Sequence, residues 1–247
     1  LSQQSEGLFN PALGQLIRAW GFQREEFTPI DIQPDAIKKM VNAKPTMADI
    51  VITGDKVKSK NPAVQLDLGG YAKGYALDKA AEKLHQLGIK NALINIGGNI
   101  IALGQHGDHP WRVGIQHPRQ PQPMATVDLL DGWAIGTSGD YQRYFVAKDG
   151  KRYCHIIDPH TGYPVAHTQA VTVLIPPQYH AGVLSDVSSK PIFIAADDKR
   201  QSMASVMGVQ NYLVVDAHGE ISLSDAMKMR IHWLKLPKQE GLSKNES

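Results

Sequence analysis

The spacing of hydrophobic and polar residues divides the chain into helical and extended segments. Near the N-terminus, Asn10 and Pro11 form a typical helix start, because asparagine can cap a helix and proline favours its first position. Apolar residues then recur at helical spacing as far as Trp20, and a glycine follows. This pattern predicts a helix over residues 11–20, and a similar pattern predicts a second helix over residues 34–41.

Further along, the apolar spacing shortens to that of strands and then returns to that of a helix. We expect a three-stranded meander over residues 50–53, 56–59 and 63–68. A long helix is expected over residues 71–87, with a glycine as its end signal. Its apolar stripe consists of Leu77, Ala80, Ala81, Leu84 and Leu87.

The rest of the chain is rich in short strand-like runs. Strands are predicted over residues 92–95, 100–103, 111–115, 125–130, 133–137, 153–157 and 171–174. A mostly helical stretch at 183–207 and a strand at 211–216 follow. Because helices and strands do not alternate regularly, the order indicates an α+β fold with mixed or antiparallel sheets. We expect one domain over residues 1–237 and a polar, disordered tail over residues 238–247.

Composition narrows the class of protein. The 247 residues are 42% hydrophobic and 20% charged, with 26 Lys plus Arg against 24 Asp plus Glu and a formal net charge of +2. This balance is that of a globular protein, and it lacks the basic excess of a nucleic-acid binder. Cys154 is the only cysteine, which excludes an internal disulfide and a thiolate zinc site, so we interpret it as a small core residue. No apolar run is long enough to span a bilayer.

Two glycine pairs are candidate ligand sites. In the run Asp67 to Tyr75, two glycines stand where a strand gives way to a helix, and a helix N-terminus favours anions. Lys73 lies in the first turn of that helix and can reach a phosphate; the alternative is a tight turn with a solvated lysine. The second pair, Gly97 and Gly98, indicates a close backbone approach to a ligand or a plain hairpin turn.

Hydroxyl, imidazole and carboxylate groups form three further candidates. The run Thr137, Ser138, Gly139 and Asp140 gathers small polar groups as in a small-molecule site, although Ser138 or Asp140 can equally cap a helix. His155 follows a strand and is suited to proton transfer near neutral pH, the alternative being a structural histidine. Asp186 precedes two serines, an arrangement that can bind a hard cation, but the residues alone favour an N-capping aspartate with a surface lysine.

Taken together and in this order, these motifs resemble the ApbE family of flavin transferases. The resemblance rests on the runs DLGGYAKGYALD, NIGGNI, TSGDYQRYF and HIIDPHTGYPV, and on the opening SEGLFNP through WGF. It extends from about Ser5 to Asp216 and implies that the N-terminal section of the family is missing from this chain. The fold it implies is α+β, with an FAD site between two sub-domains.

The resemblance also implies an activity. Members move FMN from FAD to a threonine hydroxyl of a target protein and release AMP, usually with magnesium. The expected partners are FAD and an acceptor flavoprotein subunit of a membrane redox complex, with no nucleic acid. The expected location is periplasmic or exported, with membrane contact only through a lipid anchor outside this chain. The alternatives are an FAD-binding accessory protein without transferase activity and an FAD pyrophosphatase.

The resemblance implies roles for residues at matching positions. His155 matches the histidine that activates the acceptor threonine. Gly70, through its backbone carbonyl at a position that is usually alanine, and Asp186 match magnesium ligands. The positions that match cofactor contacts are Phe9, Asp67, Lys73, Gly97, Gly98, Thr137, Ser138, Gly139 and Asp140.

One position departs from the family pattern. The family places a magnesium-binding threonine four residues after the aspartate, whereas this chain has Lys190. A protonated lysine has no lone pair and repels a divalent cation. We therefore expect a protein that binds FAD and handles magnesium poorly.

Overall fold

Within residues 1–148 and 150–234, which the computed structural model describes, the chain forms six α-helices and thirteen strands. The helices are α1 (Gly14–Ala19), α2 (Pro34–Asn42), α3 (Ala72–Gln86), α4 (Ala181–Ile194), α5 (Arg200–Val206) and α6 (Asp225–Lys228). The strands are β1 (Ile50–Thr53), β2 (Lys56–Ser59), β3 (Ala92–Ile96), β4 (Asn99–Leu103), β5 (Trp111–Gln116), β6 (Pro123–Leu129), β7 (Ala134–Gly139), β8 (Tyr144–Val146), β9 (Arg152–Cys154), β10 (Thr168–Ile175), β11 (Asn211–Asp216), β12 (Ile221–Leu223) and β13 (Ile231–Trp233).

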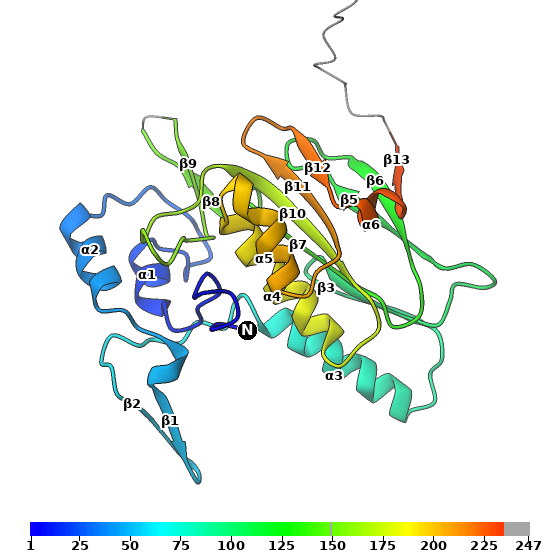
Figure 1. Ribbon diagram of the computed structural model, residues 1–247, viewed down its shortest axis with the longest axis horizontal. Helices are drawn as coiled ribbons and strands as arrows, with labels where there is room; N and C mark the ends of the chain where they lie inside the picture. Colours follow the sequence, from blue (N-terminus) through cyan, green and yellow to red (C-terminus); the bar gives the residue numbers. More distant parts are fainter. Residues whose placement is uncertain (149, 235–247) are drawn as a thin grey trace, which may run out of the picture.

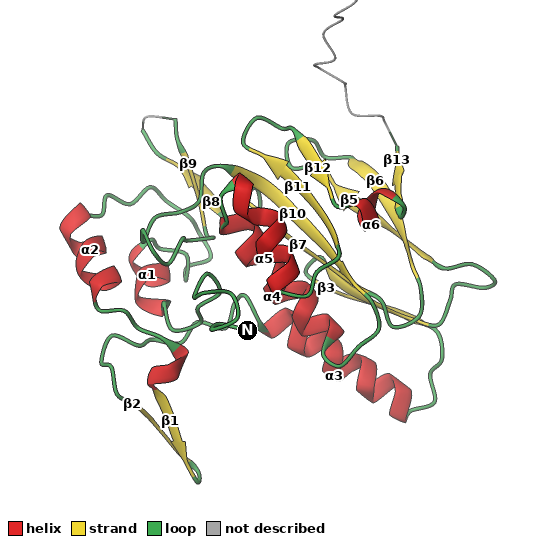
Figure 2. Ribbon diagram, viewed as in Figure 1, coloured by secondary structure: helices red, strands yellow, loops and turns green. Residues whose placement is uncertain are grey.

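A six-stranded antiparallel sheet forms the centre of the molecule, in the order β12-β11-β10-β7-β4-β3. Helices α3, α4 and α5 cover one face, and the three-stranded sheet β13-β6-β5 covers the other (Figure 2). Successive side chains of a strand point to opposite faces. Val171 and Val173 of β10 therefore pack under the helices, while Ala170 and Leu174 pack against the smaller sheet. All eight residues of β10 are buried, as expected for a strand covered on both faces.

A smaller unit, formed by α1, α2 and the β8-β9 hairpin, lies beside this layered body (Figure 1). Its core contains Leu16, Phe22, Ile37 and Phe145, with the Trp20 ring stacked 5.4 Å from Tyr153 between ring centroids. The β1-β2 hairpin projects away from both units (Figure 1). The residues that carry the chemistry lie where the smaller unit meets the helical face of the sheet.

The architecture confirms the expected α+β class with antiparallel sheets. The long helix predicted over residues 71–87 is α3, and the helical stretch 183–207 contains most of α4 and all of α5. Four short elements were not predicted from sequence: β8, β12, α6 and β13. The expected tail, residues 238–247, lies outside the described residues. None of the helices in residues 1–148 and 150–234 is long and apolar enough to cross a bilayer.

Two predictions near the N-terminus were wrong. The first helix begins at Gly14 rather than residue 11, because Asn10 forms a local turn in which its Oδ1 accepts the Ala12 N–H at 3.0 Å. Residues 63–68 do not extend the β1-β2 hairpin. They run beside the start of α1 instead, where the Gly14 N–H donates to the Gln65 carbonyl at 2.7 Å.

Candidate active site

Helices α3 and α4 cross at a pair of glycines, and this close crossing forms one wall of the site. A Cβ on Gly74 would lie against the Gly182 carbonyl oxygen and 2.7 Å from Val183 Cα. Each helix also supplies a carboxylate to the N-terminal amides of the other. Asp186 of α4 accepts the Gly74 N–H at 3.0 Å, and Asp78 of α3 accepts the N–H groups of Gly182 and Val183 at 2.7 and 3.0 Å.

Asp186 also forms an ion pair with Lys190 one turn further along α4. The Lys190 ammonium donates to Asp186 Oδ1 at 2.7 Å and to the Asp186 carbonyl at 2.6 Å. Burial alone would raise the pKa of the Asp186 carboxyl, but Lys190, the Gly74 N–H and Lys73 hold that pKa below its ordinary value. Asp186 is therefore an anion at neutral pH, and its charge is already matched by a lysine.

The Lys190 side chain lies directly against Gly70. A Cβ on residue 70 would lie 2.7 Å from Lys190 Cε, 3.0 Å from its Cδ and 3.4 Å from a ring carbon of Phe9. Real Cβ atoms do not approach carbon that closely, so the hydrogen atom of glycine makes room for the lysine.

An open pocket lies in front of this ion pair, between the smaller unit and α4. Apolar side chains from the segments on either side of α1 and from the turn after β9 form much of its wall. The chemistry-bearing residues that line it are Phe9, Asp67, Gly70, Arg143, His155 and Lys190.

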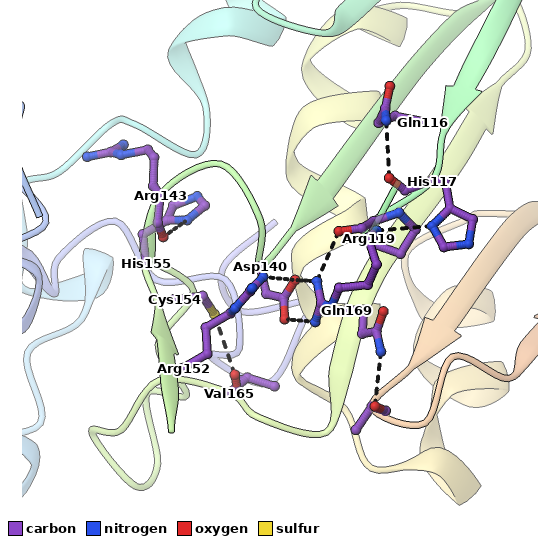
Figure 3. Close-up of polar contacts among 12 residues, drawn as sticks. Gln116, His117, Arg119, Asp140, Arg143, Arg152, Cys154, His155, Val165 and Gln169 are labelled. Atoms are coloured by element: carbon purple, nitrogen blue, oxygen red, sulfur yellow. Dashed lines mark hydrogen bonds and ion pairs between the residues drawn. The ribbon is translucent and has the colours of Figure 1, made fainter. Parts of the chain in front are cut away.

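His155 reaches the pocket from the end of β9. Its backbone N–H and its ring Nδ1–H both donate to the Arg143 carbonyl, at 3.0 and 3.3 Å (Figure 3). Because Nδ1 faces a carbonyl acceptor, it carries the proton, and the lone pair of the neutral ring is on Nε2. Burial and the nearby cations Arg143, Lys190 and Lys73 lower the pKa of His155 to about 3. The imidazole is therefore neutral at physiological pH.

Two cations, Arg143 and Lys190, line the pocket, and a third, Lys73, lies outside its lining. Lys73, in the first turn of α3, donates from Nζ to the Gly97 carbonyl at 3.4 Å. Burial lowers its pKa, the neighbouring cations Lys190 and Arg143 lower it further, and Asp186 opposes the shift. The Arg143 guanidinium donates to the Phe22 carbonyl and lies over the Phe27 ring. Their common sign makes this region suited to an anion.

The structure brings some of the sequence candidates together. Phe9, Asp67, Gly70 and His155 line the same pocket, and Asp186 borders it through Lys190. Gly97 and Lys73 contact each other but lie outside the lining of this pocket. Gly98 follows Gly97 with φ +90°, a conformation that favours glycine, and its N–H donates to Asn95 Oδ1 at 3.0 Å.

The Thr-Ser-Gly-Asp run does not line this pocket. The hydroxyls of Thr137 and Thr172 are 2.8 Å apart, and those of Ser138 and Ser189 are 2.7 Å apart. Gly139 is the last residue of β7, and a Cβ there would collide with the Tyr141 ring. The run continues a strand rather than capping a helix, so the helix-cap alternative was wrong.

Asp140 is part of a separate ion-pair cluster. Its carboxylate accepts two hydrogen bonds from Arg119, both at 2.6 Å, and Arg152 lies 3.7 Å away (Figure 3). This fork-to-fork pair joins the loop between β5 and β6 to the segment that leads to β8. Nearby, burial raises the pKa of the Cys154 thiol to about 12, which agrees with its interpretation as a core residue.

Sequence reasoning missed Arg143 and Arg119. Arg143 lies inside the run TSGDYQRYF, so its membership of that motif was the available signal. Arg119 lies in a proline-containing loop, and no local pattern indicates its pairing with Asp140.

Comparisons with known proteins agree with this fold. The model of the ApbE family matches residues 1–214. A Rhodobacter capsulatus protein named FAD:protein FMN transferase is 42% identical over 232 residues, which cover 94% of this chain and 43% of that protein. A Haemophilus influenzae protein of the same name is 32% identical over 222 residues, which cover 87% of this chain and 63% of that protein. The chain thus spans less than two thirds of the length of either relative.

Solved structures show the same similarity. The ApbE protein of Thermotoga maritima matches with a TM-score of 0.82 and 31% identity, over 93% of this chain and 74% of that one. The apo form of the Pseudomonas stutzeri flavinyl transferase ApbE matches with a TM-score of 0.75 and 30% identity, over 93% of this chain and 71% of that one.

Proposed function

This chain belongs to the ApbE family, and from that membership we propose that it transfers FMN from FAD to a threonine hydroxyl of a target protein, with release of AMP. The observation that carries the proposal is the neutral His155 on the same pocket as the cations Arg143 and Lys190. A base and a cationic anion site are the two features that this reaction requires.

In the proposed complex, the FAD diphosphate lies among the positive charges of the pocket. Lys73, Arg143 and Lys190 oppose the negative charge that develops on the AMP phosphate as it leaves. Phe9 and Asp67 lie on the same pocket and are proposed to contact the cofactor. The shared cationic environment orients the diphosphate toward His155.

His155 is the proposed general base. The threonine oxygen attacks the phosphorus of the FMN half, the bond from that phosphorus to the AMP phosphate oxygen breaks, and the threonine proton passes to Nε2 of His155. The Arg143 carbonyl fixes the tautomer that this transfer requires, because it accepts the Nδ1–H. The negative charge of bound FAD favours protonation of the ring, which offsets the surrounding cations.

The biological setting is proposed from family membership. We propose an acceptor flavoprotein subunit of a membrane redox complex, and a periplasmic or exported location in which any lipid anchor lies outside this chain. Relatives named FAD:protein FMN transferase support a protein acceptor. The membrane redox complex and the location are proposed from the family resemblance alone.

Mass spectrometry of an acceptor domain tests the transferase proposal. Incubation with FAD is expected to add FMN to the acceptor threonine, and His155→Ala is expected to slow the addition at least about 100-fold because it removes the base. His160→Ala is the matched control, since His160 is exposed in the neighbouring turn and is expected to leave the rate unchanged.

The alternative functions appear as distinct outcomes of the same assay. The Asp186–Lys190 ion pair favours an FAD-binding accessory protein as the second candidate, because it engages a carboxylate expected to bind metal. Tight FAD binding without an adduct would support that reading and contradict the transferase. Free FMN and AMP without an acceptor would indicate a pyrophosphatase.

A further inference from the structure

The residues expected to hold magnesium do not fit that ion. A hard divalent cation takes six or more oxygen ligands, and magnesium requires near-octahedral geometry. Here Asp186 Oδ1 already accepts from the Lys190 ammonium, and its Oδ2 accepts from the Gly74 N–H. In residues 1–148 and 150–234, no group of three histidine, cysteine, aspartate or glutamate side chains could hold a metal ion.

We infer that the Lys190 ammonium takes the place of a divalent cation beside the FAD diphosphate, so that this chain binds FAD without metal. This inference rests on the proposed function for the identity of the ligand. It adds to that function a metal-independent mode of binding, carried by the Asp186–Lys190 pair and Gly70.

The hydrogen bonds of Lys190 fit this role. An ammonium has three N–H donors, and two of them are directed at Asp186 Oδ1 and the Asp186 carbonyl. The contacts found in the described part of the chain leave one donor for a phosphate oxygen at the pocket, which Lys190 lines. Asp186 thus holds the lysine in place, and the lysine presents a fixed positive charge to the ligand.

Gly70 is the second component of the arrangement. A Cβ on residue 70 would lie 2.7 Å from Lys190 Cε, and the alanine usual at this position in the family carries that atom. Glycine at 70 and lysine at 190 therefore fit together sterically, and alanine at 70 would push the ammonium away from Asp186.

Three charged side chains besides the ion pair surround the proposed position. Lys73 and Arg143 are positive, and Asp67, whose Oδ1 accepts the Gly69 N–H at 2.9 Å, is negative. Because Lys190 and Asp186 neutralise each other in part, the site supplies less positive charge than a bound dication would. We therefore expect FAD binding that needs no metal but is not unusually tight.

The test measures the dissociation constant of FAD by flavin fluorescence, in EDTA and in magnesium chloride. For the natural chain the two values are expected to agree within about twofold. In the double variant Gly70→Ala with Lys190→Thr, EDTA is expected to weaken binding at least about tenfold, equivalent to about 1.4 kcal/mol. A tenfold magnesium requirement in the natural chain would overturn the inference.

Three further measurements separate a local effect from misfolding. Gly70→Ala alone is expected to weaken FAD binding in EDTA several-fold, and circular dichroism checks that it folds. Lys83→Thr, an exposed lysine of α3, is the matched control and is expected to change nothing. Manganese, added as a paramagnetic probe with FAD, is expected to give the same spectrum as manganese with FAD alone; an additional spectrum that appears only with the protein would contradict the inference.

Failure of the inference and failure of the proposed function are distinguishable. Metal-independent binding without transfer to an acceptor would support the inference and contradict the transferase. Transfer that requires magnesium at the binding step would do the reverse. Absence of FAD binding in both buffers would overturn both.

Discussion

At the residue scale, neighbouring groups determine the charge state of each side chain in the pocket. His155 is held neutral because burial and three cations oppose its protonation. Asp186 is held ionised because Lys190, an amide and Lys73 outweigh the effect of burial. His155 is thus neutral, as a general base must be, and Asp186 is negative, as a fixed counter-ion must be.

His155 should make the stability of the protein dependent on pH. Its pKa is about 3 in the folded protein and about 6.5 in an unfolded chain. Below pH 6.5 the unfolded chain binds the proton first, so the free energy of unfolding falls as the pH decreases from 6.5 toward 3. By pH 5 the loss from this residue is expected to be on the order of 1–2 kcal/mol.

Urea denaturation at pH 7 and pH 5 measures this loss. The His155→Gln variant is the comparison, because its amide can still donate to the Arg143 carbonyl but does not titrate. The midpoint of the natural protein is expected to decrease more than that of the variant. Equal decreases would show that His155 is not desolvated as the structure indicates.

At the scale of elements, the crossing of α3 and α4 depends on small residues. Gly74 and Gly182 allow the two backbones to approach, and the exchanged carboxylates of Asp78 and Asp186 hold them there. Lys73 on one helix and Lys190 on the other are positioned by this contact.

Gly74→Ala tests this crossing. Alanine is the better helix former by about 1 kcal/mol, but its Cβ would collide with backbone atoms of α4 that have no room to move. Overpacking costs typically 1–3 kcal/mol, and a clash with backbone lies in the upper part of that range. After the helix gain is subtracted, we expect a net destabilisation of about 1–2 kcal/mol by urea denaturation. Lys83→Ala, on an exposed position of α3, should stay within about 0.5 kcal/mol. A Gly74→Ala protein as stable as the natural one would contradict the close crossing.

Sequence periodicity correctly predicted elements that are determined by their own residue pattern. It failed for segments whose structure depends on partners distant in the sequence. The long helix α3 was predicted because its apolar stripe has helical spacing. The prediction of a hairpin strand at residues 63–68 was wrong, because this segment forms its hydrogen bonds with residues at the start of α1. Those partners are distant in sequence, so local periodicity does not reveal them. For the same reason, the motifs indicated His155 and Asp186 but not the pairing of Gly70 with Lys190, which only packing reveals.

At the scale of the whole molecule, the pocket lies between two hydrophobic cores. The core of the smaller unit contributes Leu13 and Phe22 to its lining, while the core under the helices contributes Phe9 and Ile156. A ligand there contacts both units at once. Binding is therefore expected to stabilise the chain as a whole rather than one unit alone.

Thermal unfolding with FAD measures this stabilisation. At a concentration 100 times its dissociation constant, a ligand that binds only the folded state adds about 2.7 kcal/mol. For a chain of this size that corresponds to roughly 5–11 °C in Tm. AMP, as the control, contains only part of the ligand and is expected to raise Tm less at the same concentration. Absence of any shift with saturating FAD would contradict binding at this pocket.

The exchange of carboxylates between α3 and α4 has a mechanical consequence. Since Asp78 and Asp186 each hold the N-terminal amides of the opposite helix, neither helix end can open without releasing the other. We therefore expect the α3–α4 wall to be the stiffer side of the pocket when a ligand binds. Any adjustment to an incoming protein chain is then expected on the opposite wall of the pocket, where His155 follows the β8-β9 hairpin.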